Sequence, residues 1–198
     1  MTKAEADPAR GVAARRSSVP LVAASRGAGM LSGMAHLQPG DEAPDFELAD
    51  DAGRRHRLSA QRPHPVVIYF YPKDSTPGCT TEACEFRDAS AEIRALGAEV
   101  WGVSPQDERS HARFREQHGL PFPLLVDGDH AVADGYGAWV EKSRYGRTYW
   151  GNARETFLVD GQGRIARAWE HVRPEGHAAE VLAALRELGA SPAPTADA

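Results

Sequence analysis

The sequence predicts an α/β protein in which a central mixed β-sheet carries helices on both faces. Two observations lead to this fold class. Short apolar, β-branched runs alternate along the chain with segments of helical period, which is typical of a sheet covered by helices. Near the end of the chain, two strand-like segments joined by a glycine turn precede an amphipathic helix. That hairpin makes the sheet mixed rather than purely parallel.

The folded part is expected to span residues 36–189 of the 198-residue chain. Residues 1–35 are rich in Ala, Gly, Ser and Arg without a sustained period, so we expect a disordered leader. A secretion signal is one alternative, although its apolar run would be short and contains Pro20. A true start at Met34 is the other. Residues 190–198 form a Pro/Ala tail that we also expect to be disordered.

The first elements are marked by turns and by period. Residues 45–59 hold two short extended pieces around a turn at Asp51–Gly53. PVVIYFY, residues 65–71, is continuously apolar and is expected to be a buried central strand. In residues 80–97, apolar side chains recur at helical spacing, and Gly97 is a natural stop.

The later elements continue the alternation of strands and helices. A stretch rich in aromatic and charged residues, 138–154, shows no clear period and is expected to be irregular. Its aromatic side chains either line an approach to a site or pack locally. The other predicted elements are a strand at 98–104, a polar helix at 107–119, a strand at 122–127, a short helix at 130–137, a two-stranded hairpin at 155–170 and an amphipathic helix at 175–189.

Charge and composition exclude several classes of function. The net charge is −5, and basic and acidic residues are mixed along the chain, so we expect neither a nucleic acid nor a membrane as partner. No apolar run approaches the ~18–20 residues that span a bilayer. Two cysteines are too few for a secreted disulfide scaffold, and we expect a cytoplasmic protein.

Both cysteines lie in one stretch, YPKDSTPGCTTEAC, at residues 71–84. Cys79 falls where a predicted strand ends and a helix begins. The N-terminus of a helix offers unpaired N–H groups and the positive end of the helix dipole, and both favour a thiolate over a thiol. Pro77 and Gly78 shape this turn, and Thr76 places a hydroxyl on the same side. A cysteine that merely fills a core would need none of these features.

The spacing of Cys79 and Cys84 limits how they can react with each other. Five residues on an ideal helix give a net rotation of ~140° and a rise of ~7.5 Å, which separates the Cα atoms by ~8–9 Å. A disulfide requires ~4.4–6.8 Å. The pair can therefore bond only if the first turns of the helix unwind. The spacing also differs from the Cys-x-x-Cys of thioredoxin-type exchange sites.

Metal binding is not expected, because a structural zinc site needs four ligands and no histidine cluster lies near the cysteines. His111 and His118 are seven apart on a polar helix, and we expect them to form a solvated face. Glu82 is interpreted first as a first-turn residue that complements the helix dipole, and only second as a residue of the site.

The segment YPKDSTPGCTTEAC resembles the active-site segment of the peroxiredoxins, with Pro72, Thr76 and Cys79 matching the pattern Pro-x-x-x-Thr-x-x-Cys. The nearby Cys84 makes it similar to the peroxiredoxin Q, or bacterioferritin comigratory protein, branch. The resemblance extends over nearly all of the folded part. Further matching segments are PGDEAPDFEL, HARFREQHGLPFPLLVD, YGAWVEKSRYGRTYWGNARETFLVDGQG and HVRPEGHAAEVLAAL.

The resemblance implies a thioredoxin-like fold and a thiol peroxidase that reduces hydrogen peroxide and organic hydroperoxides. It implies that Cys79 is the peroxidatic cysteine, Cys84 the resolving cysteine and Arg154 the active-site arginine, with Thr76 and Pro72 beside them. The Cys79–Cys84 disulfide would be reduced by thioredoxin or a similar dithiol. No metal and no organic cofactor is implied, and the branch suggests a monomer or a weak dimer.

Two other classes of function stay open on the sequence. One is a thiol–disulfide exchange protein without peroxidase activity, whose exchange would survive Thr76→Val with Arg154→Ala. The other is a redox sensor or interaction protein. Its partner binding would follow the redox state of Cys79 and Cys84, and its peroxide turnover would be negligible.

Overall fold

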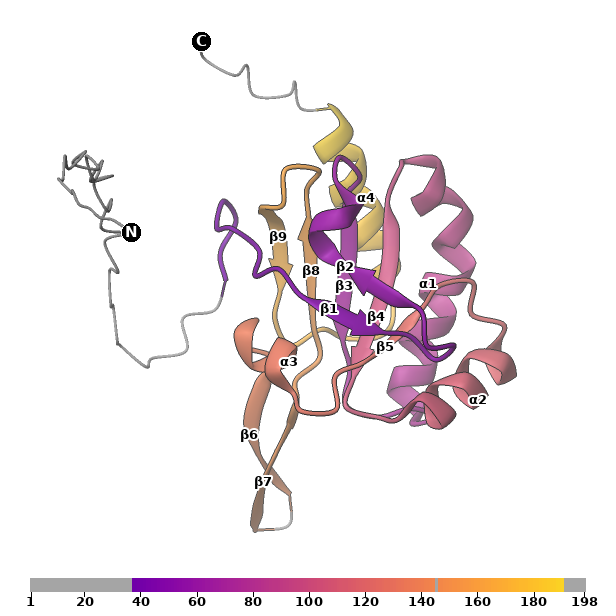
Figure 1. Ribbon diagram of the computed structural model, residues 1–198, viewed down its shortest axis with the longest axis vertical. Helices are drawn as coiled ribbons and strands as arrows, with labels where there is room; N and C mark the ends of the chain where they lie inside the picture. The colour runs from indigo at the N-terminus through magenta and orange to yellow at the C-terminus, as the bar shows by residue number, and fades with distance from the viewer. Residues whose placement is uncertain (1–36, 145, 191–198) are drawn as a thin grey trace, which may run out of the picture. The chain divides into compact units, whose positions relative to one another are not determined.

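A computed structural model describes residues 37–144 and 146–190. The expectations for residues 1–35 and for the tail after Ala190 lie outside these described residues. Within them the structure is α/β, with a mixed central sheet and helices on both of its faces, as the sequence predicts (Figure 1).

The central sheet has five strands in the order β5-β4-β3-β8-β9. β3 runs parallel to β4, and β4 runs parallel to β5, whereas β8 pairs antiparallel with both β3 and β9. The sheet is therefore mixed, and its central strand is the predicted apolar run. The strands are β3 (Val66–Phe70), β4 (Glu99–Ser104), β5 (Leu124–Val126), β8 (Glu155–Val159) and β9 (Ile165–Trp169).

Side chains of β3 alternate between two apolar cores, as the period of a strand requires. Val67 and Tyr69 face a core shared with α1 and α4, whereas Ile68 and Phe70 face a core shared with α3 and η1. Because both faces are covered, the strand is apolar throughout. The helices are η1 (Leu58–Gln61), α1 (Pro77–Ala95), α2 (Glu108–His118), α3 (Ala131–Gly135) and α4 (His177–Ala190).

Two hairpins lie outside the central sheet. β1 (Glu47–Ala49) and β2 (Arg55–Arg57) pair antiparallel around the predicted turn, which confirms that expectation. The prediction of an irregular stretch at 138–154 is wrong, because β6 (Trp139–Arg144) and β7 (Arg147–Asn152) form a second hairpin. It projects from the sheet beyond α3 (Figure 1). Most of β7 is exposed, so no alternation of polar and apolar residues marks it in the sequence.

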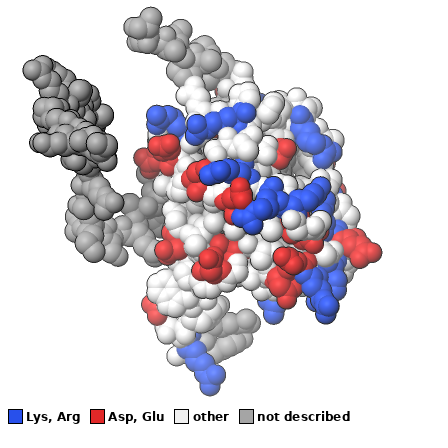
Figure 2. All heavy atoms as spheres, in the orientation of Figure 1, with Lys and Arg blue, Asp and Glu red and all other residues white. Residues whose placement is uncertain are grey.

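Figure 2 shows both acidic and basic side chains over the visible face. In the part of the chain that the structure describes, no helix is both long enough and apolar enough to cross a membrane.

Candidate active site

Cys79 lies in the first turn of α1, directly beyond the end of β3. Thr76 is the N-cap residue and Pro77 the first helical residue, a position where the missing N–H of proline has no cost. The first hydrogen bond of the helix runs from the N–H of Thr80 to the carbonyl of Thr76, at 2.8 Å. The Cys79 side chain is buried, with 1% of its surface exposed. The sulfur therefore lies among the free N–H groups of a helix start, away from bulk water.

Arg154 reaches this sulfur from the start of β8, the strand next to β3 in the sheet. In the antiparallel pairing of β3 with β8, Phe70 lies opposite Glu155, so the preceding residue lies just beyond the end of β3. The Nη2 atom of Arg154 donates to Cys79 Sγ over 3.5 Å. Burial alone would lower the pKa of Arg154, but the charges of Glu82 and Cys79 outweigh it and raise that pKa. The guanidinium is thus a permanent cation beside the thiol.

Glu82 is the third member of this group, although the sequence analysis ranked a role in the site second to a helix-dipole role. It lies beyond the first turn of α1, which holds no acidic residue, so the helix-dipole interpretation is wrong. Its carboxylate is buried and accepts a hydrogen bond from Nη1 of Arg154. Burial raises the pKa of Glu82 to about 7, although Arg154 opposes this shift. The guanidinium therefore bridges a buried carboxylate and the Cys79 sulfur.

Gly78 leaves the room that Arg154 needs. A Cβ atom at this position would lie 3.1 Å from Nη2 of Arg154 and 3.4 Å from Cγ of Pro174. The backbone of Gly78 is not in the left-handed region, so a glycine is needed here for the space that a side chain would take and not for its conformation. The Thr-Pro-Gly approach in the sequence thus allows the guanidinium to lie against the first turn of the helix.

The loop between β3 and α1 carries Pro72 and Thr76, which are both partly exposed. The Thr76 hydroxyl donates to the carbonyl of Lys73 over 3.1 Å, so its oxygen can still accept a hydrogen bond from a ligand. Ser75 in the same loop has a φ of 57°, a left-handed conformation that is costly for a residue with a side chain.

Asp74 holds this strained loop in place. Its carboxylate accepts hydrogen bonds of 2.7 Å each from the hydroxyls of Tyr71 and Ser110, and it lies 2.9 Å from Nδ1 of His111. The second ring nitrogen of His111 lies 3.3 Å from the carbonyl of Leu125, so both ring nitrogens have a partner. Burial would raise the pKa of Asp74, but its hydrogen bonds outweigh burial and lower it.

The expectation that His111 and His118 form a solvated face is wrong. His111 is fully buried and His118 half-buried. Residues seven apart lie on one side of a helix, and here that side packs inward. The polar partners, Asp74 for His111 and Cys84 for His118, come from distant parts of the chain.

Cys84 is half-buried, and both cysteines are free thiols. They lie in one continuous helix, α1, as the spacing argument requires of the reduced protein. A guanidinium also lies beside this second thiol, because Nη1 of Arg87 donates to Cys84 Sγ over 3.5 Å.

Two further ionisable groups lie near Arg154. Burial and the charge of Arg154 lower the pKa of Lys142 on β6, whose ammonium donates to the carbonyl of Asn152. Burial, with Glu170, raises the pKa of Glu155 to about 7. The sequence offered no pattern for Lys142, because the β6–β7 hairpin was not predicted, whereas Glu155 begins the predicted strand β8.

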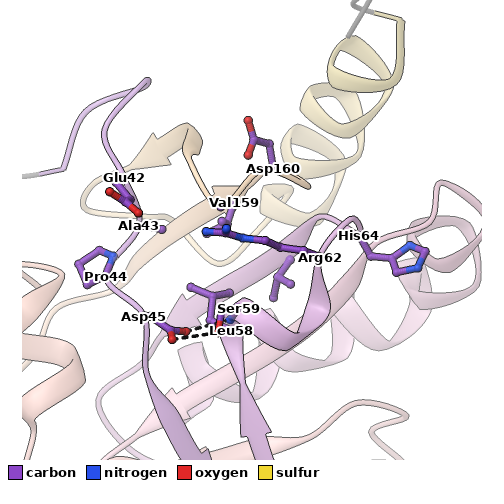
Figure 3. Close-up of a pocket in the computed structure, with 12 residues that line it drawn as sticks. Glu42, Ala43, Pro44, Asp45, Leu58, Ser59, Arg62, His64, Val159 and Asp160 are labelled. Atoms are coloured by element: carbon purple, nitrogen blue, oxygen red, sulfur yellow. Dashed lines mark hydrogen bonds between the residues drawn. The ribbon is translucent and has the colours of Figure 1, made fainter. Parts of the chain in front are cut away.

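Neither cysteine lines the cavity drawn in Figure 3, which has a volume of about 260 Å³. That cavity lies where β3 begins, at Val66, and where β8 ends, at Val159, whereas Cys79 lies beyond the opposite end of β3. Asp45 and Ser59 are hydrogen-bonded along its wall. Among the described residues, no group of three or more His, Cys, Asp or Glu side chains is placed to hold a metal ion.

Comparison with known proteins gives one consistent result. Residues 39–168 match the family model described as the AhpC/TSA family. The chain is 44% identical over 152 residues to peroxiredoxin Bcp of Bacillus subtilis, which covers 77% of this chain and 97% of that protein. It is 40% identical over 154 residues to peroxiredoxin Bcp of Escherichia coli K12, covering 78% and 99%.

Solved structures agree with these sequence relatives. A structure of peroxiredoxin Q from Xanthomonas campestris superposes with a TM-score of 0.70 at 42% identity, covering 73% of this chain and 91% of that one. A Xylella fastidiosa PrxQ mutant superposes with a TM-score of 0.73 at 34% identity, covering 77% and 98%.

Proposed function

This chain belongs to the AhpC/TSA family, as a relative of the Bcp or peroxiredoxin Q proteins, and is a thiol-dependent peroxidase with a thioredoxin-like fold; we propose that Cys79 is its peroxidatic cysteine and Cys84 its resolving cysteine. One observation carries this assignment. Only Cys79 combines a buried place in the first turn of α1 with the guanidinium of Arg154, whose Nη2 lies 3.5 Å from the sulfur.

In the first step, the Cys79 thiolate attacks one oxygen of the peroxide. An S–O bond forms as the O–O bond breaks, and the second oxygen leaves with the electron pair and takes up a proton as water or an alcohol. Arg154 and the N–H groups of Gly78 and Cys79 are the donors for the charge that develops on the oxygens. Such preorganised donors contribute a few kcal/mol each.

The surrounding residues orient these donors. Glu82 accepts from Nη1 of Arg154 and so turns Nη2 toward the sulfur. The Thr76 oxygen can accept a hydrogen bond from the peroxide, because its own O–H group donates to the carbonyl of Lys73. Pro72 shields the sulfur from bulk water. We assign no metal and no organic cofactor to the reaction.

In the second step, the sulfenic acid on Cys79 is resolved by Cys84. The Cys84 thiolate attacks the Cys79 sulfur, the S–S bond forms, and hydroxide leaves and is protonated to water. This requires the first turns of α1 to unwind, because an intact helix keeps the two residues apart. Thioredoxin or a similar dithiol then reduces the disulfide by exchange.

The substrates include hydrogen peroxide and organic hydroperoxides. Alkyl peroxide reduction activity is described for the Xanthomonas campestris bacterioferritin comigratory protein, a solved structure 41% identical to this chain, which supports the second class. We further propose a cytoplasmic protein, because free thiols persist in reducing compartments. It acts as a monomer or a weak dimer.

The assignment is tested by mass spectrometry after one equivalent of hydrogen peroxide. The wild-type chain should show an intrachain Cys79–Cys84 linkage, a loss of two hydrogens. Cys84→Ser should show oxygen added to Cys79 as sulfenic acid or a higher oxide. Oxygen trapped on Cys84 in a Cys79→Ser chain, at the wild-type rate, would reverse the two roles.

A further inference from the structure

Cys84 lies in a polar setting of its own, away from Arg154. Its half-buried sulfur accepts from Nη1 of Arg87 over 3.5 Å and lies 4.0 Å from Nδ1 of His118. Arg87 follows three residues later on α1, so it lies on the same side of the helix. His118 is the last residue of α2. Two nitrogen groups from two helices therefore face the second thiol.

The guanidinium of Arg87 is fixed at this place by acceptors on either side. Its Nη1 also donates to the carbonyl of His118 over 3.0 Å, and its Nε donates to Asp88 over 2.8 Å. The hydrogen bond to Asp88 and the charge of Cys84 raise the pKa of Arg87. The ring of His118 is held in turn by an edge contact with Phe114, at 5.0 Å between centroids.

A cation at this sulfur matters for chemistry, because only a thiolate is the nucleophile in disulfide formation. We propose that Arg87 is a positioning residue of the resolving step. Its guanidinium favours the thiolate form of Cys84 before α1 unwinds, and His118 of α2 faces the same sulfur. This inference rests on the proposed function. The reaction is the second step described above. The Cys84 thiolate supplies the electron pair of the S–S bond, and the Cys79 sulfenic acid loses hydroxide, which is protonated to water.

A purely structural role for Arg87 would have the opposite effect on the reactivity of Cys84. If the guanidinium only ties α1 to the end of α2, its removal loosens a half-buried thiol and speeds modification. If it favours the thiolate, its removal slows modification at neutral pH. At pH 10, where an ordinary thiol is largely ionised, the slowing should vanish.

The test measures the alkylation rate of Cys84 by iodoacetamide in the full chain carrying Cys79→Ser, in which Cys84 is the only thiol. This chain makes no peroxidatic turnover, so the result is independent of whether the peroxidase assignment holds. We expect Arg87→Gln to lower the rate at pH 7 about three- to fivefold, the size expected for a partly exposed charge pair. Arg87→Lys, which keeps the charge, should restore at least part of the rate.

The matched control is Arg94→Gln, which removes an arginine from the last turn of the same helix and should leave the rate unchanged. Circular dichroism of each variant verifies that α1 is folded. A second variant, His118→Gln, should also lower the rate at pH 7. An unchanged or faster rate in Arg87→Gln, or a loss that persists at pH 10, would overturn the inference.

Discussion

Gly78 shows how a missing side chain can control a reactive one. With Arg154 Nη2 only 3.1 Å from the place of a Cβ atom, any side chain at 78 displaces the guanidinium by a few tenths of an ångström or more. Small displacements of a donor weaken a preorganised site strongly. The glycine is therefore needed for chemistry even though alanine is the better helix former.

We predict that Gly78→Ala lowers kcat/KM for hydrogen peroxide about tenfold without lowering the melting temperature of the reduced protein. Steady-state kinetics with a dithiol reductant and thermal unfolding measure the two quantities. The control is Gly135→Ala, where a Cβ meets nothing within 4 Å. A loss of activity that follows a loss of stability would point to misfolding instead.

Glu82 makes the stability depend on pH in a defined direction. Its folded pKa of about 7 lies above its ordinary value of 4.5, so the folded state binds the extra proton between these values. The stability from this group is fully present below about pH 4.5 and is lost as pH rises through about 7. Glu155, whose pKa is also about 7, adds a decline in the same sense.

We predict that Glu82→Gln removes about 2 kcal/mol of the fall in unfolding free energy between pH 5 and pH 8. The decline due to Glu155 should persist. Urea unfolding of the reduced protein at several pH values measures this slope, and Glu116→Gln, an exposed change on α2, is the control. A slope equal to that of the wild type would show that Glu82 is ionised throughout this range.

The loop from Tyr71 to Thr76 is an element held by a distant helix. Asp74 connects it to Ser110 and His111 of α2, and the side chains of Asp74 and His111 are buried. These contacts hold the unfavourable φ of Ser75 and with it the position of Thr76. Because the folded pKa of Asp74 is lowered, its contribution is present above the unfolded value and is lost as pH falls through the folded value.

We predict that Asp74→Asn lowers the unfolding free energy at pH 7 by about 2 kcal/mol, since it removes a buried carboxylate that accepts hydrogen bonds from Tyr71 and Ser110. The variant should also lose part of the acid-induced fall in stability that the wild type shows. Urea unfolding between pH 3 and pH 7 measures both effects. Glu116→Gln, a change at an exposed carboxylate of α2, should leave the acid profile nearly unchanged.

On the scale of the whole molecule, we expect one end of α1 to open while the rest stays closed. The strands β3 and β8 are buried along their whole lengths, and α4 also contacts α1 beyond Cys84, where His177 packs on Phe86 and Arg186 donates to Glu92. Disulfide formation should therefore unwind residues 77–84 without unfolding the sheet. The population of such a locally open state depends on the unfolding free energy of this segment, which can be much smaller than that of the whole domain.

We predict that oxidation by one equivalent of peroxide raises amide hydrogen exchange in residues 77–84 at least about tenfold and leaves β3 and β8 protected. Exchange followed by mass spectrometry, with reduced protein as reference, measures this. Cys84→Ser, which cannot form the linkage, should keep the exchange pattern of the reduced chain after brief oxidation. Faster exchange across the whole sheet would contradict a local opening.

The sequence alone was enough for most of the elements and for the position of Cys79 at the start of a helix. Strands such as PVVIYFY and helices ended by glycine are fixed by local period and turn residues, which a reader can see directly. The resemblance to the peroxiredoxins, which extends over YGAWVEKSRYGRTYWGNARETFLVDGQG, supplied Arg154, which no local pattern ties to a thiol. The β6–β7 hairpin escaped prediction, because strands without a buried face carry no alternation.

Only the tertiary structure decided which side chains meet. Arg154 lies between Glu82 and Cys79 because β8 pairs with β3 in one register, and His111 contacts Asp74 because α2 turns that side inward. Spacing along the chain determines which residues share a helix face or a strand face. Contacts between distant segments depend on strand register and helix orientation, which the packing of the whole core sets and no local pattern contains.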